Sequence, residues 1–203
     1  MLLIDVLNRF CKGLQVITHY PSKSNESPNL HVEVLEIPSH RYELQYQSVR
    51  IEREDHRLFW SAVESMKSGR PFTWKVPVIK GVTDIQGVGG DALALATPSG
   101  SLDINVRNAP ANVLWLATGD MINFANQTKV YKVCNDVVTN NAGVGTIRLN
   151  CPLKHALPED TVVIGSGATF TLIRKPGAKA QSFSLMGGRR DVEYAELEFI
   201  EFL

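Results

Sequence analysis

The stretch GDMINFANQTKVYKV, residues 119–133, decides the fold class of this chain. Its two halves carry Ile122 and Phe124, then Val130, at the alternating positions expected of strands with one buried face. The polar segment 125–128 joins them as a turn. The stretch contains no nucleophile–base pair, no metal-ligand spacing and no phosphate-binding loop. It therefore predicts a strand–turn–strand unit of a small β-barrel, and a structural role rather than a catalytic one.

The composition is that of a soluble globular protein with no charged partner surface. The 203 residues include 21 basic and 21 acidic side chains, so the formal net charge is zero. A protein that binds a phosphate backbone needs an excess of Lys and Arg, which argues against nucleic acid as a partner. No apolar run approaches the ~20 residues needed to span a bilayer, and the start lacks the features of a secretory signal. The three cysteines form no C-x-x-C pair, which favours free thiols in a reducing compartment.

The first 81 residues predict a sheet covered by one helix. Strands are expected at 30–37, 41–51 and 72–76, and residues 21–29 are expected to be a polar loop. The helix follows Asp55, which is predicted to be its N-cap. Gly69 and Pro71 are expected to end it. Its apolar stripe consists of Leu58, Phe59, Ala62, Val63 and Met66.

The central part of the chain differs in composition. Residues 82–172 carry only 5 basic and 7 acidic side chains, and this stretch is rich in Asn, Gly, Thr and Val. Several short strands at regular spacing predict a small barrel. The segment 82–100, rich in Gly and other small residues, is expected to mark a domain boundary. Within it, GVGG at 87–90 is expected to be a flexible linker, since it lacks the Lys-Ser/Thr of a phosphate loop. The expected strands are 101–106, 121–124, 129–136, 144–150, 161–164 and 168–173.

The end of the chain resembles its beginning in pattern. Residues 193–202 alternate aliphatic or aromatic with acidic side chains, as a strand lying on a sheet would. We expect this strand to complete the N-terminal sheet. The prediction is thus a mainly β protein with one prominent helix, in which residues 1–81 plus 174–203 form a discontinuous sheet-and-helix domain. Residues 82–173 would be an inserted OB-like β-barrel, because insertion at an exposed turn costs little.

An ordered set of segments resembles the distal tail proteins of long, flexible-tailed bacteriophages. The set consists of RYEL at 41–44, the helix near 58–68, FTW at 72–74, TGDMINF at 118–124, KVYKV at 129–133, the strand at 146–150, Pro-Leu at 152–153 and the closing strand. The resemblance covers most of the chain from about residue 40 onward.

The resemblance implies a structural virion protein of the tail tip, assembled in the cytoplasm of the host bacterium. The sheet-and-helix domain would form a homo-oligomeric ring, a hexamer in this family, and the barrel would project from it. The ring would join the tail tube protein to the tail hub and to fibre or receptor-binding proteins. The resemblance implies no enzymatic activity, no cofactor and no membrane partner.

The residues also bear on two other classes of function, a carbohydrate-binding module and an enzyme. The barrel could instead capture a glycan on a host surface, making the chain a two-domain carbohydrate-binding module. An enzyme is disfavoured, because Cys151 and His155 lack a third orienting group and are expected to be structural. The five histidines show no metal-ligand spacing, so no metal site is predicted.

Six residues are candidate contacts to other subunits or partners. The mixed-charge run around the helix start is either a solvated face or a contact in a ring, and so is the arginine pair of the last turn. One tryptophan on the flank of the helical stripe is either a core residue or a contact to a neighbour. These candidates are Arg50, Arg53, Arg57, Trp60, Arg189 and Arg190.

Overall fold

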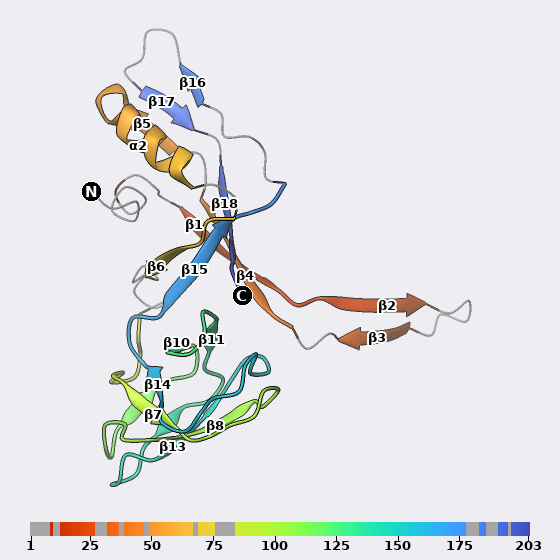
Figure 1. The fold of residues 1–203 in the computed structure, drawn as a ribbon, viewed down its shortest axis with the longest axis vertical. Helices are drawn as coiled ribbons and strands as arrows, with labels where there is room; N and C mark the ends of the chain where they lie inside the picture. Colours follow the sequence, from red (N-terminus) through yellow and green to blue (C-terminus); the bar gives the residue numbers. More distant parts are fainter. Residues whose placement is uncertain are drawn as a thin grey trace. The chain divides into compact units, whose positions relative to one another are not determined.

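The computed structural model of the chain is mainly β, and the residues that it describes include one helix of several turns, as the sequence predicts (Figure 1). It describes residues 9, 13–26, 32–36, 39–46, 49–66, 69–75, 84–177, 183–185, 191–194 and 196–203. Within these residues, helix α2 (Arg53–Ser65) is accompanied by antiparallel sheets.

The chain divides into two compact units, and both are discontinuous in sequence. The first unit contains residues 1–19, 41–74 and 172–202, and the second contains residues 20–40, 75–171 and 203. The expected boundaries were 81 and 173. The main difference is that residues 20–40, assigned from the sequence to the outer domain, cluster with the barrel. His40 explains part of this, because it is buried and bonded to Lys129 of the barrel.

The first unit is built on a five-stranded sheet into which the closing strand inserts (Figure 1). Strand β18 pairs antiparallel with β4, so that Leu197 lies opposite Tyr46 and Phe199 opposite Leu44. All four side chains are buried. The closing strand therefore pairs with the N-terminal sheet, as its pattern predicted. The strand order is β1 (Leu14–His19), β4 (Arg41–Tyr46), β18 (Leu197–Glu201), β15 (Thr169–Arg174) and β6 (Phe72–Lys75).

Aromatic side chains form much of the core of this unit. The Tyr46 ring meets the edges of Trp74 and Phe199, with ring centroids 6.0 and 6.3 Å apart. Phe72 meets Phe199 in the same edge-to-face manner at 5.4 Å. Such pairs stabilise a core beyond the apolar area they bury.

Helix α2 contacts a separate three-stranded sheet, ordered β16 (Phe183–Leu185), β17 (Asp191–Tyr194) and β5 (Val49–Glu52). Phe59, Val63 and Met66 are buried on the helix, whereas Leu58 is 39% exposed. The predicted N-cap was wrong. The helix begins two residues before Asp55, Glu52 occupies the cap position, and no side chain caps the helix.

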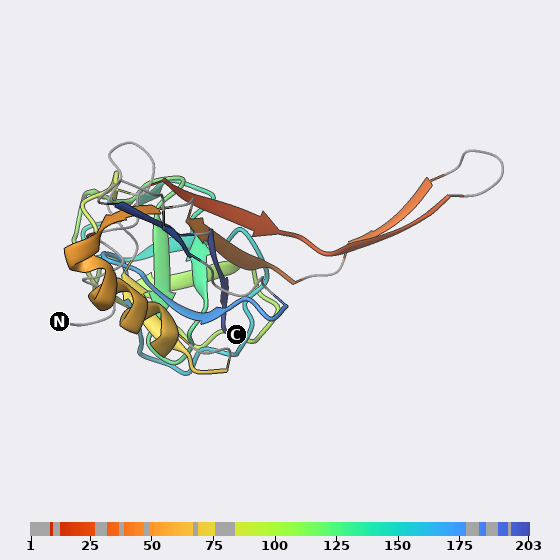
Figure 2. The ribbon, with the colours of Figure 1, turned by 90° about the horizontal axis from the view of Figure 1, so that it is seen from above.

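The segment expected to be a polar loop is largely a strand. β2 (Ser22–Glu26) pairs antiparallel with β3 (Val32–Glu36), and Figure 2 shows the two as a two-stranded ribbon. The sequence SKSNE lacks the β-branched and aromatic residues that indicate a strand, so the sequence alone gave no signal for it. Within the described residues, β2 and β3 pair only with each other.

The second unit contains a six-stranded barrel. Its sheet runs in the order β11 (Val130–Lys132), β10 (Met121–Phe124), β14 (Thr161–Ile164), β7 (Ala92–Ala94), β8 (Asp103–Arg107) and β13 (Gly145–Arg148). A bridge between Val133 and Leu149, and a hydrogen bond from Cys134 N to Arg148 O, join the last strand to the first. The sheet therefore closes on itself, which removes both of its edges. A short two-stranded sheet of β9 (Leu114–Leu116) and β12 (Val137–Val138) accompanies it.

The prediction of a flexible linker at 87–90 was wrong, because Val88 N and Gly89 N donate hydrogen bonds to Leu114 O and Trp115 O. The wider segment 82–100, expected to mark a domain boundary, contains a strand of the barrel. Strand β7 lies between β14 and β8, with Ala92 and Ala94 buried. Small side chains there leave room for the large residues of the barrel core, such as Trp115 and Phe124. Gly87 allows its backbone to lie close to that of Trp115, because a Cβ at this position would lie 2.3 Å from Trp115 O. Close packing against the barrel core, rather than flexibility, therefore explains the small residues of this segment.

Candidate functional site

The stretch 119–133 contributes Lys129 to a pocket in the second unit, and buried polar side chains hold this stretch in place. Asp120 is 3% exposed, and its side chain accepts hydrogen bonds from Ala117 N at 2.8 Å, Gln86 N at 2.9 Å and Gly87 N at 3.2 Å. One side chain thereby satisfies three backbone donors, of which that of Ala117 is buried. This carboxylate connects the start of β10 to the segment that precedes β7.

Asn123 fixes the hairpin that follows. Its Nδ2 donates to Lys129 O at 3.0 Å, and its Oδ1 accepts from Thr169 N at 2.6 Å. The side chain is 5% exposed. One buried amide thus links β10 to the start of β11 and to the start of β15. The position of Lys129 is therefore set by backbone pairing and by a side-chain bond.

Lys129 carries its ammonium group to a buried histidine. Its Nζ donates to His40 O at 2.8 Å and lies 3.0 Å from His40 Nδ1, and both residues are 3% exposed. The other ring nitrogen, His40 Nε2, lies 3.3 Å from Asn150 Nδ2. The Tyr20 ring lies 4.9 Å from that of His40. Within the second unit, these contacts attach His40 and Tyr20 to the barrel.

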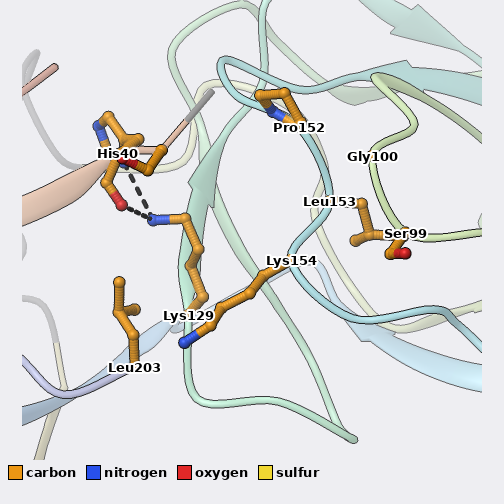
Figure 3. A pocket seen from close by; sticks show the side chains of 9 residues that line it. His40, Ser99, Gly100, Lys129, Pro152, Leu153, Lys154 and Leu203 are labelled. Atoms are coloured by element: carbon orange, nitrogen blue, oxygen red, sulfur yellow. Dashed lines mark hydrogen bonds between the residues drawn. The ribbon is translucent and has the colours of Figure 1, made fainter. Parts of the chain in front are cut away.

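A pocket of about 500 Å³ opens beside this pair (Figure 3). Two lysines and a histidine contribute nitrogen atoms, two serines contribute hydroxyls, and proline and leucine side chains form an apolar wall. The lining residues are Ser39, His40, Ser99, Gly100, Lys129, Pro152, Leu153, Lys154 and Leu203. The volume lies within the range of pockets that hold small molecules.

Hydrogen bonds hold the two loops of the pocket together. Gly100 N donates to Leu153 O at 2.7 Å, and Leu153 N donates to Ser101 O at 2.9 Å. Lys154 N donates to the Tyr131 hydroxyl at 2.9 Å, and that hydroxyl donates to Gln127 Oε1 at 2.8 Å. Hydrogen bonds therefore connect the loop of residues 152–154 to residues 100 and 101 on one side and to Tyr131 on the other.

A second polar cluster lies on the five-stranded sheet of the first unit. The carboxylate of Glu43 on β4 accepts from Lys175 Nζ at 2.7 Å and Gln45 Nε2 at 2.8 Å, and lies 2.8 Å from His19 Nε2. Lys175 also pairs with Glu198 at 2.9 Å. Burial alone would raise the pKa of Glu43, but the bonds from Lys175, Gln45 and His19 outweigh burial and hold that pKa below 4.5, its ordinary value. The pKa of Lys175 is raised by its hydrogen bonds to Glu43 and Glu198.

Of the six predicted contact residues, none that the structure describes lines the pocket or bonds to Glu43. Arg50 lies on β5 opposite Glu193, and Arg53 begins α2. Arg57 is exposed on the helix, and Trp60 is half-buried with its ring stacked on His56 at 6.5 Å. Arg189 and Arg190 lie outside the described residues.

Sequence reasoning missed the pocket residues because they come from segments far apart in the chain. Lys129 was expected only to begin the strand 129–136, and His40 lies in the short connection between the expected strands 30–37 and 41–51. The one usable signal was the lysine at the start of a barrel strand, which the structure shows to be buried.

The residues considered for catalysis differ in burial: Cys151 is a buried member of the barrel core, whereas His155 is exposed. Within the described residues, no group of three His, Cys, Asp or Glu side chains could hold a metal ion. The described helices also include none long and apolar enough to cross a membrane.

A search against protein-family models found no family that matches the chain, and a search of curated proteins found no match either. The function of this chain is therefore inferred from its residues and their geometry.

Proposed function

We propose that this chain is a structural adaptor of a phage tail tip, which assembles with copies of itself into a ring. The ordered set of segments that resembles distal tail proteins supports this role, and the resemblance supplies six as the copy number. The tail tube protein, the hub and the fibre proteins would be its partners. The observation that carries the proposal is the β2–β3 ribbon, because it is an element that needs a partner.

The ribbon is poorly stabilised by its own chain. A two-stranded hairpin is marginal in water unless a third strand or a packing surface covers it. Leu35 is 66% exposed on β3, and Ser22, Lys23 and Ser24 are exposed on β2. Among the described residues, β2 and β3 pair only with each other, so their outer edges offer backbone groups for pairing with another chain. A neighbouring copy in a ring would cover this surface and satisfy those groups.

A ring follows when such a contact is heterologous. The ribbon of one subunit would contact a different surface on the next subunit, and a rotation that closes gives a cyclic assembly. The outer side of α2 offers a surface of the right kind, with Leu58 39% exposed, Arg57 exposed and Trp60 half-buried. Arg57 and Trp60 thus remain candidate contacts.

The assembly state tests this proposal directly. Light scattering and negative-stain imaging of the full chain should show a closed ring at micromolar concentration. Leu35→Asp should shift the assembly to smaller species and weaken association about tenfold or more, because a desolvated apolar contact is replaced by a charge. Val138→Asp is the matched control, since Val138 is 67% exposed but lies on the barrel strand β12.

Two outcomes would contradict the proposal. One is a wild-type chain that stays monomeric at every concentration, alone and with tail partners. The other is a loss of assembly in Val138→Asp equal to that in Leu35→Asp, which would locate the contact on the barrel. The carbohydrate-binding alternative gains no specific support, because the described residues that line the pocket include no aromatic side chain on which a sugar could stack. A glycan array would test it independently.

A further inference from the structure

Strand β1 is the outermost strand on one side of the five-stranded sheet, and among the described residues it pairs only with β4. The two strands pair in one antiparallel register from Leu14, opposite Tyr46, to His19, opposite Arg41. No bulge interrupts this register. The outer edge of β1 therefore presents a regular row of backbone N–H and C=O groups to which a further strand can bind.

This edge lacks the features that usually prevent such binding. Proteins protect an open strand edge with charged side chains, proline or a bulge. The other edge of the same sheet has such protection, because Pro71 precedes β6 and the exposed Lys75 ends it. The sequence of β1, LQVITH, contains no Lys, Arg, Asp, Glu or Pro. Leu14, Val16 and Ile17 are only half-buried, so an added strand would also remove apolar surface from water.

The same sequence contains an element that can occupy this edge. Among the described residues, β2 and β3 pair only with each other, and each has five residues, against six in β1. A two-stranded ribbon is stabilised when a third strand joins it. Addition of the ribbon of one copy to β1 of another copy would therefore cover one open edge on each of the two partners.

The charges of the two elements are complementary. Residues 22–36 contain three Glu and one Lys, a net charge of −2. β1 itself carries no acidic residue, and Arg41, opposite its last residue His19, is exposed. The nearby carboxylate of Glu43 is buried and paired with Lys175. Because opposite charges on neighbouring strands stabilise their pairing, this edge favours an acidic partner strand.

We propose that the outer edge of β1 binds the β2–β3 ribbon of a second copy of this chain by strand addition. This inference rests on the ring proposed above, and it adds the surface that receives the ribbon and the backbone pairing that joins the two. The contact is heterologous, because β1 of one copy meets the ribbon of the next. It can therefore repeat from copy to copy until the ring closes.

Amide hydrogen exchange of the full chain, followed by mass spectrometry, tests this pairing. Assembled protein is compared with protein dissociated by dilution. Peptides that contain β1 and peptides that contain β2 or β3 should exchange at least about tenfold more slowly in the assembly, because paired backbone amides are protected. Peptides of β10 are the control, since β10 is paired on both sides within its own barrel and should not change.

Two substitutions at one exposed position of β1 test the charge complementarity. Thr18→Glu should weaken assembly about fivefold, because it places a negative charge beside the acidic ribbon. Thr18→Lys is the matched control, with the opposite charge at the same position, and it should assemble at least as tightly as the wild-type chain.

The outcomes separate this inference from the proposed function. A wild-type chain that never assembles overturns both. A ring in which the amides of β2 and β3 are slowed but those of β1 are not leaves the ring in place and overturns the pairing with β1. Equal assembly of Thr18→Glu and Thr18→Lys overturns it as well.

Discussion

Glu43 is a charged side chain in a nearly closed environment, and its neighbours explain why it remains ionised. It is 2% exposed, and Lys175, Gln45 and His19 all lie within hydrogen-bond distance of its carboxylate. A buried carboxylate without such partners would take up a proton instead. The closing strand contributes an acidic side chain to this network, because Glu198 on β18 also forms an ion pair with Lys175.

This cluster predicts a specific pH dependence of stability. The pKa of Glu43 is lower in the folded chain than its ordinary 4.5, so its stabilising effect is complete above that value and is lost as the pH falls through the folded pKa. Glu43→Gln should lower the free energy of unfolding at pH 7 by roughly 1–2 kcal/mol, a range reduced for the partial exposure of Lys175. The loss should shrink below pH 4.5.

Denaturant unfolding of both chains between pH 3 and pH 7 measures this difference. Glu198→Gln serves as the control, because Glu198 is more exposed and bonds only to one end of the network, and a smaller loss is expected. A difference between wild type and Glu43→Gln that is constant across the pH range would contradict the assigned role.

At the scale of elements, alternating sequence patterns predicted strands well, and small or polar residues did not. The structure places β10 and β14 at the predicted positions, 121–124 and 161–164, because β10 buries Ile122 and Phe124 on one face and β14 consists of β-branched residues. It places β7 in a segment expected to mark a domain boundary, since Ala-Leu-Ala carries little strand signal. The secondary structure of such segments is determined by tertiary packing, which depends on residues distant in the sequence.

The candidate site was harder to predict than the fold for the same reason. Lys129 and Asn150 belong to barrel strands or their ends, but His40 comes from the beginning of β4 and Leu203 follows β18. Which of these segments meet depends on the topology of the whole chain. Composition indicated a nearly uncharged barrel, and it could not show that two of its five basic residues line one pocket.

The segment before β7 gives a prediction at this scale. Asp120→Ala removes the acceptor of three backbone N–H groups, from Gln86, Gly87 and Ala117. The buried donor of Ala117 would be left without its acceptor, which is costly, whereas water can reach the partly exposed donors of Gln86 and Gly87, so the free energy of unfolding should fall by roughly 1–3 kcal/mol. Asp103→Ala is the control, because the Asp103 side chain is 57% exposed, and it should change stability by less than about 0.5 kcal/mol. Equal effects in a denaturant titration would show that the carboxylate of Asp120 does not hold this segment.

At the scale of the molecule, the chain builds two cores from interleaved segments. The barrel core draws all its members from residues 92–163, including Trp115, Phe124 and Tyr131. The core of the first unit needs the two ends of the chain, because Phe199 on β18 packs against Tyr46 and Phe72. The barrel can therefore be completed by continuous chain, whereas the sheet of the first unit cannot form before β18 is available.

This separation predicts that the two cores lose stability independently. Phe124→Ala and Phe199→Ala each remove a fully buried ring, and each should destabilise its own unit by roughly 3–5 kcal/mol. Amide hydrogen exchange followed by mass spectrometry reports the two units at once, because local opening free energies differ between cooperative regions. Phe124→Ala should speed exchange in β10, β14 and β7 and leave β4 and β18 protected, and Phe199→Ala should do the reverse. If either variant reduced protection in both sets of strands alike, the units would unfold as one, and the chain would have to be treated as a single cooperative domain.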